Sequence, residues 1–346
     1  MASLSNGSHP FLLACRREPV PFTPIWLMRQ AGRYLPEYRR IRERLPFLEL
    51  CRRSDLAAQV TVDAAQRLGV DAAIIFADIL LPLVVMGIPL RFESGDGPRI
   101  DSPIRTAADL DRLRPADIGE IRFVAETIRL VRLALSGRVP VIGFAGAPFT
   151  LASYMIEGGS SREYLVTKRL IHHERALWDR LMERIVDVTN AYVRMQIDAG
   201  ADAIQLFDSW VGALSPDDYR RCALPYVRRV IASVGHAVPV IYFGTMTAGL
   251  LEEMRSCGAD VIGVDWRIRL DAAWERLGEG VAIQGNLDPA LLFADAREIR
   301  TAARDLCRSV RGRRGHIFNL GHGILPETPV DNVLALVEAV HEFALS

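Results

Sequence analysis

The fold of this chain is decided by the stretch PIWLMRQAGRYLPEY, residues 24–38. It opens with an apolar run, 24–27, that is typical of a buried strand, and it continues into a turn that carries Arg29 and Arg33. A planar guanidinium group binds carboxylate or phosphate through two parallel hydrogen bonds, so two nearby arginines at a strand end predict a polyanionic ligand. Two solvated arginines ahead of a helix are the alternative explanation of the same spacing.

Further apolar runs repeat the pattern of 24–27 along the chain. Continuous apolar runs without polar alternation are typical of strands that are buried on both faces, as in parallel sheets. The strands are expected at 24–27, 72–76, 139–144, 203–207, 238–243, 261–264, 281–284 and 317–320. Helical patterns lie between them, at 55–68, 121–135, 163–199, 217–233, 247–257, 270–277, 296–310 and 330–345.

Strands that alternate with helices in this way predict an α/β fold, a single-domain (β/α)8 TIM-type barrel over residues 21–346. Residues 1–20 are expected to be a loosely ordered N-terminal segment. The extra length falls at 83–118, which predicts a β-hairpin or a loop insertion with a turn at 95–98, and at 145–175. An open doubly wound sheet is the rival, but it would normally place a glycine-rich phosphate loop after its first strand.

Composition limits the kinds of partner. The formal net charge is zero, so no global field favours nucleic acid or a membrane surface. Five scattered cysteines lack the spacing of a zinc site and predict free thiols in a reducing compartment, hence a cytoplasmic location and no metal. The apolar stretch 72–90 contains Asp78 and Pro82, and a mid-span aspartate costs about 2.5–3.5 kcal/mol on membrane insertion, so a buried strand is the better interpretation.

Chemistry in a barrel sits at the carboxyl ends of its strands. There the sequence offers two arginines, an acid in an apolar run, hydroxyl groups and a histidine, and it lacks both a histidine–cysteine cluster and a strand-end lysine. This set favours a cofactor-free site for an anionic ligand. The candidates are Arg29, Arg33, Asp78, Tyr154, Ser209 and His322. Structural explanations stay open: Asp78 could cap a turn, Ser209 could cap a helix, and Tyr154 could be an ordinary half-buried aromatic residue.

Taken together, these segments closely resemble the uroporphyrinogen decarboxylase family. The resemblance covers almost the whole chain and is carried by PIWLMRQAGRYLPEY (24–38), DAAIIFADIL (71–80), GFAGAPFTLASYMIEG (143–158), FDSW (207–210), DW (265–266), QGNLDP (284–289) and NLGHGILPETP (319–329). One segment departs from the family pattern, which has a glycine-rich, often lysine-bearing turn after the fifth strand. The contacts of residues 244–247 therefore stay open.

The resemblance implies a barrel-fold carboxy-lyase without a cofactor. It would convert uroporphyrinogen III into coproporphyrinogen III by removing CO2 from four acetate side chains, in tetrapyrrole (haem) biosynthesis, as a cytoplasmic homodimer. By the same resemblance, Asp78 meets the pyrrole N–H groups, while Tyr154, Ser209 and His322 contact carboxylates or the ring edge. Substrate also binds the loop that contains Arg29, Gln30, Ala31, Gly32 and Arg33. The implied catalytic residues are Asp78, Arg29 and Tyr154.

The chemistry of the reaction accounts for these residue types. Loss of CO2 from an acetate leaves a carbanion that needs an electron sink, and a pyrrole protonated on carbon becomes an iminium ion that can serve as that sink. No pyridoxal, thiamine or metal is then required. A carboxylate such as Asp78 would stabilise the cationic ring by preorganised opposite charge. The acid that protonates the pyrrole and the order in which the four rings react stay open.

Two other functions are considered. A methyltransferase of the same superfamily, acting on corrinoid or thiol methyl groups, would carry zinc ligands, His-x-Cys near the fifth strand and Cys near the eighth. Those places read Tyr242-Phe243-Gly244 and Asn319-Leu320-Gly321. A non-catalytic tetrapyrrole-binding protein is the second alternative, and the presence of all six candidate residues argues against it.

Overall fold

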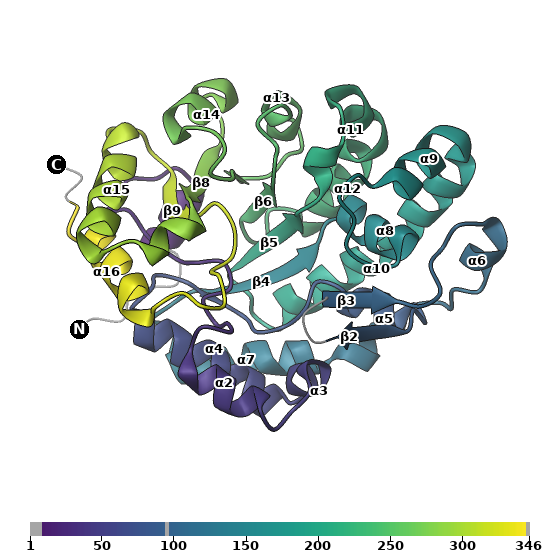
Figure 1. Ribbon diagram of the computed structural model, residues 1–346, viewed down its shortest axis with the longest axis horizontal. Coiled ribbons are helices and arrows are strands. Elements are labelled where there is room, and N and C mark those ends of the chain that lie inside the picture. Colours follow the sequence, from purple (N-terminus) through teal and green to yellow (C-terminus); the bar gives the residue numbers. More distant parts are fainter. Residues whose placement is uncertain (1–8, 94–96, 344–346) are drawn as a thin grey trace.

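A curled, all-parallel sheet of seven strands forms the centre of the chain (Figure 1). The computed structural model describes residues 9–93 and 97–343. Strands follow one another around the sheet in the order β1-β4-β5-β6-β7-β8-β9. Their bounds are β1 Ala73–Ile74, β4 Val141–Gly146, β5 Ala203–Asp208, β6 Val240–Gly244, β7 Val261–Gly263, β8 Ala282–Leu287 and β9 His316–Leu320. The register pairs Ile142 with Ala203, Ile204 with Val240, and Ile283 with His316.

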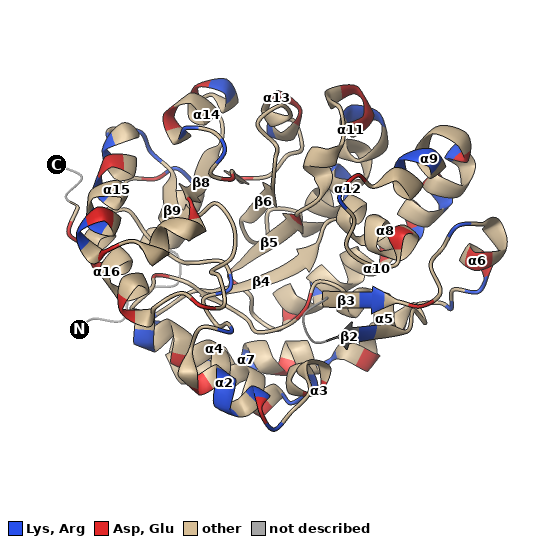
Figure 2. Ribbon diagram, in the orientation of Figure 1, with Lys and Arg blue, Asp and Glu red and all other residues tan. Residues whose placement is uncertain are grey.

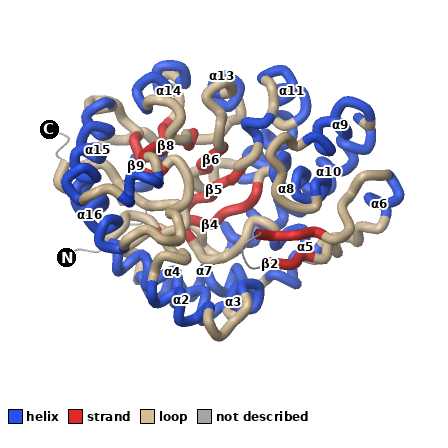
Figure 3. Tube along the Cα trace, in the orientation of Figure 1, coloured by secondary structure: helices blue, strands red, loops and turns tan. Residues whose placement is uncertain are grey.

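Burial on both faces explains why these segments are strands. Every residue of β4, β6, β8 and β9 is buried, so their continuous apolar runs match a sheet that is covered on both sides. Seven expected strands are thereby confirmed, each within a few residues of its predicted ends. Helices cover the outer face of the sheet, and Figures 1 and 3 show them as an arc around the strands. The described chain thus has an α/β fold with a curled parallel sheet.

The eighth expected strand, 24–27, is wrong as a strand. Only Ile25 forms an isolated bridge, to Phe318 of β9. The segment is extended and bonded on both sides: Phe318 N donates to Pro24 O at 2.8 Å, and Asp71 N, just before β1, donates to Ile25 O at 2.7 Å. Pro24 has no N–H and the chain turns at Met28, so the segment is too short for a continuous ladder.

Two predicted helices are each divided in two. Residues 163–199 form α9 Leu165–His173 and α10 Arg175–Asp198, because Glu174 between them has a non-helical backbone. Residues 217–233 form α11 Pro216–Cys222 and α12 Leu224–Val234. Pro225 lacks an N–H and fits only the first turn of a helix, so it starts α12 rather than continuing α11.

The remaining expected helices occur within two residues of their predicted bounds, with two exceptions. The helix expected at 247–257 covers only 251–255, and the one expected at 330–345 ends at His341, with residues 344 and 345 outside the described part. The observed counterparts are α4 Ser54–Leu68, α7 Phe123–Leu135, α13 Leu251–Arg255, α14 Leu270–Leu277, α15 Ala296–Ser309 and α16 Val330–His341. Helices that the sequence pattern did not indicate are α1 Pro10–Cys15, α2 Pro36–Arg42, α3 Phe47–Arg52, α5 Leu81–Val85, α6 Ala107–Asp111 and α8 Pro148–Glu157, with 3-10 turns η1 Ile118–Ile121, η2 Val211–Ala213 and η3 Pro289–Phe293.

The N-terminal segment differs from the expectation of loose order over residues 10–15. These residues form α1, whose Phe11 and Ala14 are fully buried in the core. The apolar side chains of this short run are what hold it to the sheet. The hairpin expected within 83–118 is confirmed as β2 Leu90–Glu93 paired antiparallel with β3 Gly97–Ile100. Its predicted turn at 95–98 lies partly outside the described residues.

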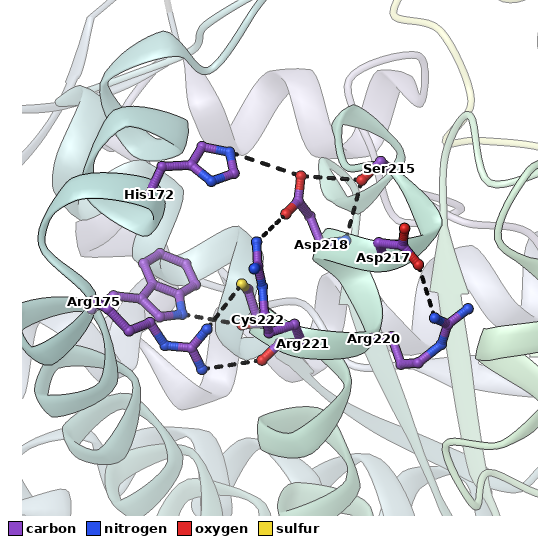
Figure 4. A network of polar contacts seen from close by, with 9 residues as sticks. His172, Arg175, Ser215, Asp217, Asp218, Arg220, Arg221 and Cys222 are labelled. Carbon is purple, nitrogen blue, oxygen red and sulfur yellow. Dashed lines mark hydrogen bonds and ion pairs between the residues drawn. The ribbon is translucent and has the colours of Figure 1, made fainter.

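Charged side chains lie mostly on the outer helices and loops (Figure 2). One cluster of them joins α9 and α10 to α11 (Figure 4). Arg175 donates to Cys222 Sγ at 3.3 Å and to the Arg221 carbonyl at 3.2 Å, while Asp218 pairs with Arg221 at 2.7 Å. This network fixes the helices around β5. Over the described residues, no helix is both long and apolar enough to cross a membrane.

Candidate active site

The loop after 24–27 is held rigidly from beneath. Gln30 is fully buried, and its side chain accepts a hydrogen bond from Leu27 N and donates one to Ala72 O, both at 3.0 Å. Met28 N donates to Asn319 Oδ1 of β9 at 3.1 Å. The side chain of Gln30 is therefore part of the frame of the loop rather than of a surface that a ligand could touch. Ala31 is buried beside it, and Gly32 lies close to the Arg29 carbonyl.

Arg29 is the residue around which the other candidates gather. Its backbone is left-handed, with φ of 63°, a conformation that is uncommon for residues other than glycine. The side chain keeps accessible surface, yet burial lowers its pKa, followed by the like charge of Arg33, while Tyr154 and Asp78 raise it. The Arg29 side chain is thus reached by water and partly desolvated by the surrounding protein.

Arg29 and Arg33 have no counter-ion within the part of the chain that the structure describes. Many other arginines of the described chain pair with Asp or Glu, but neither Arg29 nor Arg33 forms an ion pair among the described residues. Both are exposed, and each adds to the positive potential at the other. Two adjacent cations without carboxylate partners favour binding of an anion with more than one charge.

Asp78 lies beside this positive pair. Burial raises the pKa of its carboxyl group to about 6, against a hydrogen bond from Leu80 N and the charge of Arg29, which both lower it. The bond from Leu80 N to Oδ1 is 2.8 Å long, so the turn-capping role is present. Among the described residues, the second oxygen has no hydrogen-bond partner. That oxygen remains available to a ligand that donates N–H groups.

Tyr154 lies close to Arg29 and Asp78. It lies on α8, half buried, and its phenol is an electrostatic neighbour of Asp78 and Arg29. Burial raises its pKa, with Asp78 adding to the effect, so the phenol stays protonated. Its ring stacks on Trp210, with ring centroids 3.8 Å apart, and Trp210 also contacts Tyr164. The motif FDSW contains Trp210, but the sequence alone did not single it out as a site residue.

His322 faces Arg29 from the loop after β9. Burial, followed by the charges of Arg29 and Arg267, lowers the pKa of its imidazole to about 4. The ring is therefore neutral at pH 7. It lies nearly parallel to the Phe243 ring, with centroids 6.4 Å apart, and its buried Nδ1 has no hydrogen-bond partner among the described residues. A Cβ at Gly323 would overlap the Arg29 side chain, so glycine next to His322 leaves the space that Arg29 occupies.

Ser209 and the loop at 244–247 complete the ring of strand ends. Ser209 is half buried, adjacent to Trp210, and its carbonyl accepts a hydrogen bond from Thr245 Oγ1 at 2.5 Å. Met246 N donates to Asp265 Oδ2 at 2.7 Å. The loop therefore ties the ends of β5, β6 and β7 together. Arg267, which stacks on Trp266 at 4.0 Å and lies near His322, is a further cation that the sequence pattern did not reveal.

The structure therefore brings Arg29, Arg33, Asp78, Tyr154 and His322 together, with Ser209 adjacent through Trp210. No group of three or more His, Cys, Asp or Glu side chains that could hold a metal is present in the part of the chain that is described. Two surface hollows, along α15 and beside α7, contain none of the candidate residues.

This fold, with unpaired arginines and a half-buried carboxylate at the strand ends, defines an α/β enzyme for an anionic substrate. The model of the family described as uroporphyrinogen decarboxylase (URO-D) matches residues 6–343. Uroporphyrinogen decarboxylase from Koribacter versatilis is 54% identical over 336 residues, covering 96% of each chain. That from Solibacter usitatus is 55% identical over 334 residues, covering 96% of this chain and 97% of the relative. The chain belongs to the uroporphyrinogen decarboxylase family.

Among solved structures, a methyltransferase from Methanosarcina mazei superposes with a TM-score of 0.77 at 22% sequence identity, covering 96% of this chain and 97% of the other. A B12-independent methionine synthase from Shewanella superposes with a TM-score of 0.58 at 11% identity, covering 86% and 88%. At these identities the likeness concerns the fold alone.

Proposed function

We propose that this chain is a carboxy-lyase that removes CO2 from the four acetate side chains of uroporphyrinogen III and releases coproporphyrinogen III. The observation that carries the proposal is the proximity of Arg29 to Arg33 and to the half-buried Asp78, with neither arginine in an ion pair among the described residues. A substrate with eight carboxylates and four central N–H groups needs cations at its rim and an acceptor at its centre. Family membership supports the same reaction.

The arginines bind and orient the substrate. Each guanidinium can hold a carboxylate through two hydrogen bonds. Partial desolvation of Arg29 by the surrounding protein strengthens the attraction. Ser209 and the neutral His322 add hydrogen bonds at the rim. Because the pKa of His322 is lowered to about 4, the imidazole contributes a hydrogen bond and no charge at neutral pH.

Asp78 accepts pyrrole N–H groups and stabilises the ring when it becomes cationic. Protonation of a pyrrole carbon gives an iminium ion, the C–C bond to the acetate carboxylate breaks, and its electron pair neutralises the iminium as CO2 leaves. A proton then adds to the exocyclic methylene carbon to form the methyl group, and loss of the proton first added to the ring carbon restores the aromatic pyrrole. The negative charge of Asp78 is already in place when the ring gains its positive charge, so this stabilisation needs no reorganisation. The phenol of Tyr154 lies beside both groups.

Further properties complete the proposal. The reaction proceeds without a metal or organic cofactor, because the substrate is its own electron sink. Residues 24–27 take the place of an eighth strand and close the sheet into a (β/α)8 barrel in a single domain, which their hydrogen bonds to Phe318 and Asp71 support. The protein works as a homodimer in the cytoplasm. Five free, buried cysteines accord with a reducing compartment.

Anaerobic incubation with chemically reduced uroporphyrinogen III tests the proposal. The products are oxidised and separated by their number of carboxylates. We expect loss of the eight-carboxylate species and accumulation of a four-carboxylate product. Substrate that binds without losing carboxylates would instead support a non-catalytic tetrapyrrole-binding protein.

A further inference from the structure

Asp208, a buried carboxylate that is not among the candidate site residues, accepts an unusually large number of hydrogen bonds. Asp208, the last residue of β5, is fully buried. Its Oδ1 accepts hydrogen bonds from Thr150 N at 3.1 Å and from Thr150 Oγ1 at 2.7 Å, and its Oδ2 accepts one from the Tyr242 hydroxyl at 2.7 Å. Burying a carboxylate is costly unless such donors compensate it. A carboxylate kept here therefore calls for an explanation.

Asp208 caps a helix that belongs to another part of the chain. Helix α8 begins after Ala147, which provides no side-chain cap, and Thr150 is its third residue. The first N–H groups of a helix lack partners within the helix, and a carboxylate near them is favoured by the helix dipole. An N-cap side chain normally lies directly before the helix and accepts a hydrogen bond from its first turn. Asp208 accepts that bond for α8 although it lies at the end of β5.

The hydroxyl of Thr150 extends this bond to the site. While it donates to Asp208, it also accepts a hydrogen bond from Trp210 N at 3.3 Å. Trp210 stacks on Tyr154, which follows Thr150 by four positions and so lies on the same face of α8. Asp208, Thr150, Trp210 and Tyr154 therefore form a closed circuit between the end of β5 and the first turns of α8.

We propose that Asp208 is a positioning residue that, through Thr150, locks α8 to the loop after β5 so that Trp210 holds the Tyr154 phenol beside Asp78 and Arg29. This inference rests on the proposed role of Tyr154 in the decarboxylation. The circuit fixes both partners of the stack at once, the helix that carries Tyr154 and the loop that carries Trp210. A small shift of either would move the phenol relative to the reacting ring.

A second threonine in the chain provides a matched control. Thr167 is the third residue of α9, is fully buried, and bonds one carboxylate oxygen, Glu157 Oε1, through both its N–H and its hydroxyl at 2.9 Å. The chemistry equals that of Thr150 with Asp208. No hydrogen bond from Thr167 reaches Trp210 among the described residues. Substituting either threonine removes the same kind of bond, but only one of them belongs to the circuit.

The test is a double-mutant cycle with uroporphyrinogen III as substrate. Thr150→Val keeps the N–H bond to Asp208 but removes the hydroxyl, and it should lower kcat/KM about tenfold, as a small misplacement of a reacting group does. In a Tyr154→Phe background, which keeps the ring but has no phenol oxygen to position, the same substitution should change kcat/KM less than about twofold. Thr150→Ser should restore most of the activity. Thr167→Val should lower Tm similarly while kcat/KM stays within about twofold of wild type.

A second readout does not depend on turnover. The near-ultraviolet circular dichroism of the Trp210–Tyr154 pair should change in Thr150→Val and remain as in wild type in Thr167→Val. Equal losses of kcat/KM from Thr150→Val in both backgrounds, or an unchanged dichroism spectrum, would overturn the positioning role. If Tyr154→Phe alone retains wild-type kcat/KM, the proposed role of Tyr154 fails, and the dichroism still decides whether the circuit sets the stack. Should Thr150→Val not fold, Asp208→Asn takes its place in the cycle.

Discussion

Asp78 combines two opposing properties at the scale of a single residue. It lies where substrate carboxylates are expected, although like charges repel, and burial raises its pKa to about 6. A side chain that served only to accept the Leu80 N–H bond could be an asparagine at no such cost. The negative charge is therefore best explained by a positive charge that appears only during the reaction.

Replacing the charge should separate binding from catalysis. In Asp78→Asn the amide oxygen still accepts hydrogen bonds, so KM should change little, whereas kcat should fall by about 10²–10³-fold, as on loss of one preorganised electrostatic group. Asp78→Glu should also be impaired, because an extra methylene moves the carboxylate into the space of the ring. Steady-state kinetics of both folded variants measure this. Near-normal kcat in Asp78→Asn would leave the residue only its turn-capping role.

The same substitution should increase stability at neutral pH. The carboxyl pKa rises from its ordinary value of 3.8 to about 6 on folding, so between these pH values the folded state binds more protons than the unfolded state, and ionisation costs stability as the pH rises. Asp78→Asn should therefore be more stable than wild type by about 1–3 kcal/mol at pH 7. The difference should vanish near pH 4. Urea unfolding at the two pH values measures both quantities.

The pH dependence of turnover follows from the same pKa. The ionised Asp78 is the active form, so kcat/KM should fall as the pH drops through about 6. The titratable groups that face it are Arg29, Tyr154, Tyr192 and Cys51, of which burial raises the pKa values of the last three. None of these four is expected to titrate near pH 6. An acidic limb that persists unchanged in Asp78→Asn would assign the pKa to another group, such as Asp208 or the substrate.

Arg33 tests whether the loop recognises shape or only charge. Arg33→Ala should raise KM, since removing one partner of a desolvated charge pair costs about 2–5 kcal/mol. Arg33→Lys should recover only part of that loss, because an ammonium group cannot form the bidentate contact. Binding and kinetics of the two variants are compared with wild type. Full activity in Arg33→Lys would mean that positive charge alone is required.

At the scale of single residues, sequence patterns located the reactive side chains better than the residues that surround them and hold them in place. Strand ends and charge identified Arg29, Asp78 and His322, which the structure brings together. Gln30 lies in the same motif but points into the core, since spacing alone does not tell which side of an irregular loop is buried. Trp210 contacts Tyr154 of α8, and Arg267 lies near His322, and a single sequence has no periodic signal for contacts between segments so far apart in the chain.

At the scale of elements, Asp71 joins three segments. Asp71 lies shortly before β1. Its Oδ2 accepts a hydrogen bond from Ile25 N at 2.8 Å and lies 2.9 Å from Nε2 of His341, which belongs to α16. Asp71→Ala should leave Ile25 N without its partner and reduce the free energy of unfolding by about 1–3 kcal/mol. His341→Ala removes the more exposed contact to Asp71 and the edge-on contact of its ring with Phe22, and it should cost about 0–1 kcal/mol. Chemical denaturation of both variants gives the two values. Equal effects would show that the bond to Ile25 contributes nothing.

Elements were predictable where one local property dominates. The buried strands stand out because both faces are covered, and α14 was predicted with its observed bounds, Leu270–Leu277, from its amphipathic spacing. The exceptions depend on distant partners. Residues 24–27 are extended between β9 and Asp71 without a ladder of their own, and α1 is helical because the core buries Phe11. Neither partner is visible in the local sequence.

For the whole molecule, the reaction sets an expectation about cofactors. Exhaustive dialysis against a chelator should leave the decarboxylase rate unchanged, because the substrate supplies the electron sink and the described residues include no cluster suited to a metal. The measurement is turnover before and after chelation, with metal content determined alongside. Loss of activity that zinc restores would favour the methyltransferase interpretation.

The bond between Met28 N and Asn319 Oδ1 also has a consequence for synthesis on the ribosome, because it joins residues 291 positions apart. At about 5–20 residues per second, the loop that carries Arg29 and Arg33 waits roughly 15–60 s after its translation before β9 emerges to anchor it. During that interval the apolar residues 24–27 have no partner from β9, and unpaired segments of this kind are the surfaces that chaperones protect. Catalytic competence therefore arises only after residue 319 has been translated, and a nascent chain stalled before that residue would hold Arg29 and Arg33 without a fixed orientation.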